Sequence, residues 1–102
     1  MSDKDKLIRG LAGSRRVYIG EDELTPRESE KVICHSPDGF NWGYGGSGPA
    51  QLALAILLKF VSTWDATRLY QQFKWDIIAK FPQVEDFAIS VDHVQDWINK
   101  NR

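Results

Sequence analysis

The longest hydrophobic run of the chain predicts a buried central helix. Pro49 suits a first helical turn, and from Ala50 the sequence continues AQLALAILLKFV as far as Val61. Apolar residues lie on every face of this helix, which is typical of a helix surrounded by other elements or by lipid. The run is shorter than the roughly 20 residues that a membrane span needs. We therefore expect a helix over about 49–61 inside a soluble domain, with no membrane contact.

The pattern beyond this run predicts two further helices with a short strand between them. One set of apolar residues recurs at helical spacing: Leu69, Tyr70, Phe73, Ile77, Ile78 and Phe81. This spacing predicts an amphipathic helix over about 66–81, with Thr63 or Asp65 as its N-cap and Pro82 just beyond its end. Residues 87–89 read as a strand, and Ser90 then caps a final helix over about 91–99.

The first half of the chain predicts short antiparallel strands. Residues 6–10 and 15–19 favour strands, and the turn at 20–23 leads the chain back through Leu24. Pro26 begins either a loop or a helix, and the apolar residues 32–34 precede turn chemistry at 35–39. The sum is a small α+β fold of one domain, residues 1–102, with strands mainly in the N-terminal half packed on the central helix. Residues 1–5 are expected to be frayed.

Composition and charge set limits on function. The formal net charge of −1 gives no general attraction to nucleic acid or to an anionic membrane. A single cysteine and a charged N-terminus without a following apolar segment indicate a reducing compartment, and we expect the cytoplasm. Between Val32 and Leu58 the only charged residue is Asp38. That segment is either interior or an uncharged surface for a partner.

Glycine-rich residues 43–48 precede the central helix and match the pattern G-x-G-x-x-G. A dinucleotide site also needs a strand before the glycines and an acid about 20 residues later, and here the nearest acid, Asp65, lies in a break between helices. We therefore expect no cofactor. A small anion held by the free amides of residues 45–48 is a weaker alternative, and tight packing of the loop is another.

Catalytic and metal signatures are absent from the sequence. Ser47 is not in a nucleophile elbow, because Pro49 occupies the last glycine position, and we expect Ser47 or Gly48 to cap the helix. Two histidines and one cysteine fall short of the four ligands of a zinc site. We expect His35 to hold the turn at 36–39 by hydrogen bonds. The pair Arg15 and Arg16 reads as a solvated strand edge.

Aromatic residues alternate with the glycines of this loop. Phe40, Trp42 and Tyr44 are suited to stacking on bases, to lining a peptide groove or to packing in the core. Direct binding of nucleic acid is disfavoured, because no basic residue lies between Val32 and Leu58.

The stretch HSPDGFNWGYGGSGPAQLALAIL, from His35 to Leu57, resembles the signature of an uncharacterised family of small bacterial, plasmid and phage proteins. The stretch YQQFKWDIIAKFP, from Tyr70, is similar to the second helix of that family. The resemblance implies a compact domain and brings no assigned activity and no catalytic residues. Through the occurrence of such genes in mobile DNA, the resemblance also implies, as an alternative, a role in inhibiting a host nucleic-acid machine.

Three functional hypotheses follow, and the leading one is a non-enzymatic binding module that contacts a protein partner through loop 40–48. The candidate binding residues are His35, Phe40, Trp42, Tyr44, Gly45, Gly46, Ser47 and Gly48. The second hypothesis is a small anion- or nucleotide-binding enzyme that uses the 45–48 amides with His35 as acid or base. The third is an inhibitor from a phage or mobile element.

Overall fold

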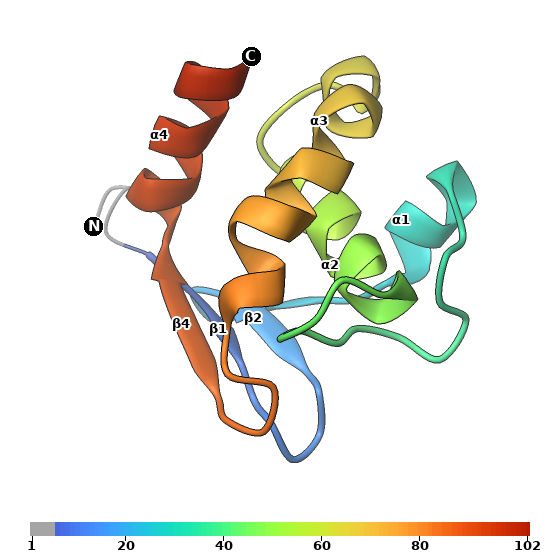
Figure 1. Cartoon of the computed structure of the whole chain (residues 1–102), viewed down its shortest axis with the longest axis vertical. Helices are drawn as coiled ribbons and strands as arrows, with labels where there is room; N and C mark the ends of the chain where they lie inside the picture. Colours follow the sequence, from blue (N-terminus) through green and yellow to red (C-terminus); the bar gives the residue numbers. More distant parts are fainter. Residues whose placement is uncertain (1–5) are drawn as a thin grey trace.

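One antiparallel sheet of four strands lies on one side of the molecule (Figure 1). The computed structural model describes residues 6–102, so the predicted fraying of residues 1–5 lies outside the described residues. The strands are β1 (Leu7–Gly10), β2 (Val17–Ile19), β3 (Asp22–Leu24) and β4 (Phe87–Ser90), in the spatial order β3-β2-β1-β4. In the register of this sheet, Ile8 on β1 lies opposite Ile19 on β2 and Ile89 on β4. The predicted α+β fold is confirmed.

Helix α2 (Ser47–Leu58) lies at the centre of the fold and is buried on every side from Gly48 to Leu57. This confirms the buried central helix, although its bounds differ from the predicted 49–61. The backbone of Gly46 is extended and stands at the N-cap, and the chain turns at Lys59, whose N–H bonds the carbonyl of Ile56. Ser47 is the first helical residue and makes no capping hydrogen bond through its side chain, so the predicted cap at Ser47 or Gly48 is wrong.

Helix α3 (Thr63–Asp76) packs along α2 and is offset from the predicted helix over 66–81. Its N-cap is Ser62, whose Oγ accepts a hydrogen bond from the N–H of Asp65, so the predicted caps Thr63 and Asp65 are wrong. The α-helix ends because Ile77 leaves helical geometry, and a 3₁₀ turn, η2 (Ile78–Lys80), follows. Pro82 therefore lies beyond a helix that has already ended.

Helix α4 (Val91–Asn101) continues directly from β4 and flanks the molecule on the side opposite to α1 (Figure 1). Ser90 ends the strand and also caps the helix, since its Oγ accepts a hydrogen bond from the N–H of His93. The predicted strand, cap and final helix are confirmed. Trp97 on α4 packs edge-to-face on Phe73 of α3, with ring centroids 4.9 Å apart, and this contact joins α4 to the core.

In the first half of the chain, one of two alternatives is confirmed and one expectation needs correction. Helix α1 (Arg27–Val32) begins directly after Pro26, as the helical alternative predicted, and the chain continues as a loop in which Cys34 is exposed. Arg15 is a loop residue with φ +62° rather than part of a solvated strand edge. Its guanidinium lies 4.5 Å from the centre of the Trp42 ring and donates a 2.7 Å hydrogen bond to the carbonyl of Gln83. This contact fastens the β1–β2 loop to the core.

None of the helices within residues 6–102 combines the length and the apolar character needed to cross a bilayer.

Candidate binding site

The connection between α1 and α2 is anchored by one buried amide. Gln51 on α2 is fully buried, and its Oε1 accepts hydrogen bonds from the N–H groups of His35 (2.7 Å) and Ser36 (3.1 Å). Its Nε2 donates to Ser29 Oγ (2.8 Å) and to the carbonyl of Ile33 (3.1 Å). Both ends of the amide are thus paired, as a buried polar group requires. Gln51 was not predicted as an anchor, although a single polar residue inside an apolar helix was a usable signal.

The side chain of His35 contacts α3 and makes no hydrogen bond to the turn at residues 36–39 that follows it. Its Nε2 and the hydroxyl of Tyr70 share a hydrogen bond of 2.7 Å. The turn that follows is closed by the backbone, since the N–H of Gly39 donates to the carbonyl of Ser36. The prediction that His35 holds this turn through its side chain is therefore wrong. Among the hydrogen bonds of the described residues, those of His35 go to Gln51 and Tyr70, and none goes to residues 45–48.

The first half of the glycine-aromatic loop belongs to the core. Phe40 and Trp42 are buried, and Trp42 has no exposed surface. The Trp42 ring meets Phe87 of β4 edge-to-face at 4.8 Å, and its Nε1 donates a 3.0 Å hydrogen bond to the carbonyl of Glu85. Gly43 has φ +86°, and its N–H donates to the carbonyl of Ile78. Neither aromatic side chain of this half is available to a partner.

The second half of the loop lies at the surface together with the end of α3. Tyr44 is 39% exposed and Trp75 is 58% exposed. A β-carbon added to Gly45 would overlap the Trp75 ring, and one added to Gly46 would overlap the Tyr44 ring. The two glycines are thus needed for the close approach of the rings to the backbone. We call Tyr44, Gly45, Gly46 and Trp75 the aromatic patch.

One cation lies beside the aromatic patch. The residue Lys74 is buried, but its Nζ lies 4.5 Å from the centre of the exposed Trp75 ring. This distance allows a cation–π interaction, and the aliphatic stem of the lysine packs in the protein while its charged end reaches the ring. The contact of Trp75 with Gly45 was not predicted from the sequence, because periodicity carries no information on contacts between distant segments.

The start of α2 adjoins the aromatic patch. Ser47 is exposed, whereas Gly48 is buried against Asn41, where an added β-carbon would lie 2.6 Å from the Asn41 Cβ. The first amides of a helix have no partner inside the helix, and here the first intrahelical bond is donated by the N–H of Ala50 to the carbonyl of Gly46. Of the candidate residues, Gly46 therefore lies beside Tyr44, Ser47 follows it at the surface, and Gly48 serves packing.

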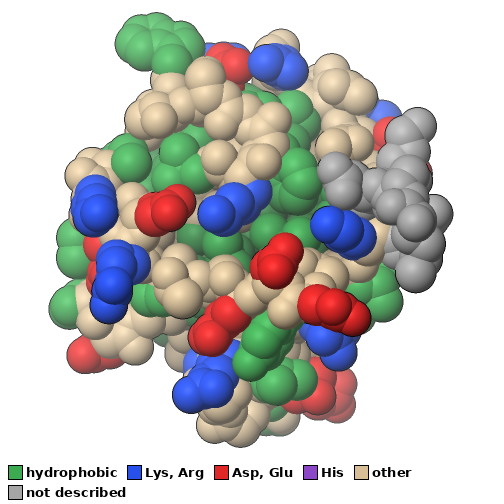
Figure 2. All heavy atoms as spheres, turned by 180° about the vertical axis from the view of Figure 1, so that it is seen from behind, with side chains coloured by type: hydrophobic (Ala, Val, Ile, Leu, Met, Phe, Trp, Pro, Cys, Tyr) green, Lys and Arg blue, Asp and Glu red, His purple; other side chains and the backbone are tan. Residues whose placement is uncertain are grey.

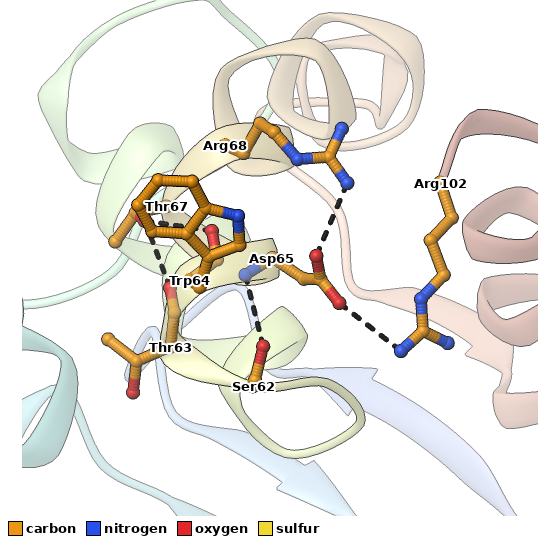
Figure 3. A network of polar contacts seen from close by, with 7 residues as sticks. All are labelled: Ser62, Thr63, Trp64, Asp65, Thr67, Arg68 and Arg102. Atoms are coloured by element: carbon orange, nitrogen blue, oxygen red, sulfur yellow. Dashed lines mark hydrogen bonds and ion pairs between the residues drawn. The ribbon is translucent and has the colours of Figure 1, made fainter.

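The other end of α3 carries a second exposed tryptophan in a different setting. Trp64 is 77% exposed and stands in the first turn of the helix. Figure 3 shows its ring pointing away from Asp65, which bridges Arg68 (3.3 Å) and Arg102 (3.2 Å). Exposed ion pairs of this kind contribute roughly 0–1 kcal/mol, and this one ties the last residue of the chain to α3. Trp64 has no glycine loop under its ring and serves as a control for Trp75.

Charges on the face opposite to the view of Figure 1 are mixed. Figure 2 shows Lys and Arg side chains interspersed with Asp and Glu over this face, with hydrophobic atoms between them. Such a face has no broad basic area of the kind that tracks a nucleic-acid backbone.

The chain is thus a small α+β domain with a glycine-aromatic loop over residues 40–48. The first half of this loop is buried in the core, and the second half lies at the surface. The chain belongs to a family of unknown function (DUF6166), whose model matches residues 8–100. Comparison with curated proteins and with solved structures finds no match.

Proposed function

We propose that the chain is a non-enzymatic binding module that recognises a protein partner through the aromatic patch. The observation that carries this proposal is that Trp75 and Tyr44 are exposed while their rings lie directly against the backbone of Gly45 and Gly46. A soluble domain gains stability by burying large aromatic rings, so two such rings held at the surface need another explanation. Tryptophan and tyrosine are also the residues that most often dominate binding energy at protein interfaces.

The close packing of both rings against glycine backbone favours a role in binding over exposure without a function. Each ring lies against backbone that a β-carbon would obstruct, which limits how far the ring moves. A side chain that is already ordered loses little conformational entropy when a partner binds. The patch thus has the preorganisation expected of a binding site, whereas Trp64 lacks it.

The chemistry of the patch indicates what kind of partner surface fits. The rings offer apolar area, and Lys74 adds a positive charge beside Trp75. The hydroxyl of Ser47 and the amides at the start of α2 add donors for a carbonyl or carboxylate group. A partner with an apolar side chain next to an acceptor group suits this arrangement.

A cross-linking experiment followed by titration tests the proposal. A photoreactive phenylalanine analogue at position 44 should capture a partner in cells of the source organism, and the same analogue at Tyr18, on the sheet, serves as the control position. With the purified partner, Trp75→Ala should weaken binding about tenfold or more. Trp64→Ala should leave the dissociation constant within about twofold. Equal losses in both variants, or no loss in Trp75→Ala, would contradict the proposal.

A further inference from the structure

The two edges of the sheet differ in their protection against strand pairing. At one edge, β3 carries the charges of Asp22 and Glu23, which is a usual way to discourage a further strand. At the other edge, β4 has the sequence FAIS, with no charge and no proline. Figure 1 shows β4 at the outside of the sheet, with no further strand of the described chain beyond it.

The register identifies the backbone groups that β4 presents to the open side. The N–H of Val91 donates to the carbonyl of Lys6, and Leu7 lies opposite Ser90. Hydrogen-bonded and non-bonded pairs alternate along an antiparallel ladder, so Ile89 bonds to β1 while Ala88 and Ser90 do not. The N–H and C=O groups of Ala88 and the N–H of Ser90 therefore point away from β1, towards the open edge, whereas the carbonyl of Ser90 stands at the N-cap of α4.

An open groove of about 410 Å³ runs beside this edge. Its apolar lining includes the half-buried side chains of Ile77 and Phe81, which lie on either side of the η2 turn, and of Ile89 on β4. A strand added to β4 would direct alternate side chains to the two faces of the sheet, and those on the helix-bearing face would enter this groove. The edge thus offers backbone partners and an apolar pocket together, as strand-addition sites do.

Acidic residues flank the edge at both ends. Glu85 and Asp86 precede β4, and Asp92 and Asp96 follow it on α4, all four of them exposed. The groups that face the groove from neighbouring elements are Asp76, Lys80 and His93, and Asp76 accepts a 2.9 Å hydrogen bond from Trp97. On the other face of the sheet, Arg9 lies opposite Ala88. Acids therefore outnumber bases around the edge.

This charge distribution decides between a second copy and another occupant. If two copies paired in antiparallel orientation through β4, the acids that precede β4 in one copy would approach the acids in the first turns of α4 in the other. Bringing like charges together in this way is unfavourable. A basic segment would instead find acids beyond each end of β4.

We propose that the open edge of β4 pairs with an extended segment of a protein partner, with an apolar residue in the groove and Lys or Arg residues flanking it. This site is separate from the aromatic patch. At the end of α3, Trp75 lies against Gly45 of the loop, whereas the next residue, Asp76, is bonded to Trp97 of α4. The two surfaces are thus divided by the end of α3, and each can be tested without the other.

The probe is a capped peptide KKVSISVKK, titrated into isotopically labelled protein at low ionic strength and followed by NMR. We expect the largest shifts at the amides of Ala88 and Ser90 and in the groove. A matched peptide EEVSISVEE should bind at least tenfold more weakly, because its charges repel the flanking acids. Two further versions of the basic peptide are N-methylated, one on the odd-numbered and the other on the even-numbered backbone amides. Only one of these two versions should lose binding, since a paired strand donates hydrogen bonds to its neighbour from every second amide.

Protein variants give the complementary control. Ala88→Pro removes an outward N–H without removing a bond to β1 and should weaken the basic peptide at least tenfold. Glu23→Pro makes the same change at the other edge, where the alternation along β2 and β3 also directs residue 23 outwards, and should leave affinity unchanged. The N-methylated peptides keep the test valid if Ala88→Pro does not fold.

Four results would overturn the proposal. They are the absence of peptide binding, equal binding of the acidic peptide, equal loss with both N-methylated peptides, and self-association of the protein through Ala88 and Ser90. The last result would assign the edge to a second copy of the chain.

Discussion

The two halves of loop 40–48 have similar composition, but the aromatic residues of the first half are buried and that of the second half is exposed. Trp42 is enclosed by Phe87 of β4 and by the guanidinium of Arg15, and it has no exposed surface. Tyr44, two residues later, lies on Gly46 at the surface. The difference teaches that alternation of glycine with aromatic residues does not by itself indicate a site. What decides is whether distant segments cover the ring.

This contrast assigns different energetic roles to the two halves. The inner half buries large rings against the sheet, so its residues stabilise the fold. The outer half leaves two rings partly in water, so its residues contribute less to folding and are available for binding. Variants of the two halves should therefore separate stability from affinity.

The largest effect is expected for Trp42→Ala. Removing a fully buried ring leaves a cavity and should lower the free energy of unfolding by about 3–5 kcal/mol. Urea denaturation followed by circular dichroism measures this change. The control is Trp64→Ala, which removes the same side chain from an exposed site and should change stability by no more than about 0.5 kcal/mol. Similar losses in both variants would contradict the division of the loop.

The next largest effect is expected for Gln51→Leu, which tests the anchor of the inner half. The leucine fills similar volume but leaves the N–H groups of His35 and Ser36 without their acceptor. We expect a loss of about 1–3 kcal/mol together with faster hydrogen exchange at Ser36. A neutral or stabilising result would mean that the loop is held in another way.

Gly45→Ala should act on the aromatic patch with a smaller cost in stability. The new β-carbon overlaps the Trp75 ring, which must move. We expect a loss of about 1 kcal/mol, a shifted indole N–H signal of Trp75 and weaker partner binding. Gly13→Ala is the matched control, because nothing lies within 4 Å of a β-carbon there. An unmoved Trp75 signal would show that the ring does not depend on the glycine.

Tyr44→Ala should have the smallest effect on folding and a large effect on binding. The ring is partly exposed, so the free energy of unfolding should change by no more than about 0.5–1 kcal/mol. The dissociation constant for the cross-linked partner should rise about tenfold. A large loss of stability with unchanged affinity would show that Tyr44 stabilises the fold, as Trp42 does, and does not contact the partner.

Much of the fold was predictable from local chemistry. The all-round apolar run predicted the burial of α2, and Ser90 predicted the start of α4, because both signals reside in neighbouring residues. The bounds of α3 were not predictable in the same way. Ser62, Thr63 and Asp65 are all suitable caps, and the helical spacing of apolar residues continues to Phe81 although the α-helix ends at Asp76.

The candidate site was predictable only in part. Tyr44, Gly45 and Gly46 were identified from the composition of the loop, whereas Trp75 joins them through a contact with a segment far away in the sequence. The burial of Trp42 depends on Phe87 of β4, which the chain reaches only after two more helices. Nothing in the spacing of the loop distinguishes the Trp42 ring from that of Tyr44.

Hydrogen exchange across residues 40–48, with and without the purified partner, tests the division of the loop most directly. The amides of Trp42 and Gly43 should exchange slowly in the free protein, because one is buried and the other bonds the carbonyl of Ile78. The amides of Gly46 and Ser47 should exchange fast and become protected when the partner binds. Slow exchange through the whole segment, unchanged by the partner, would contradict the account and make the entire loop part of the scaffold.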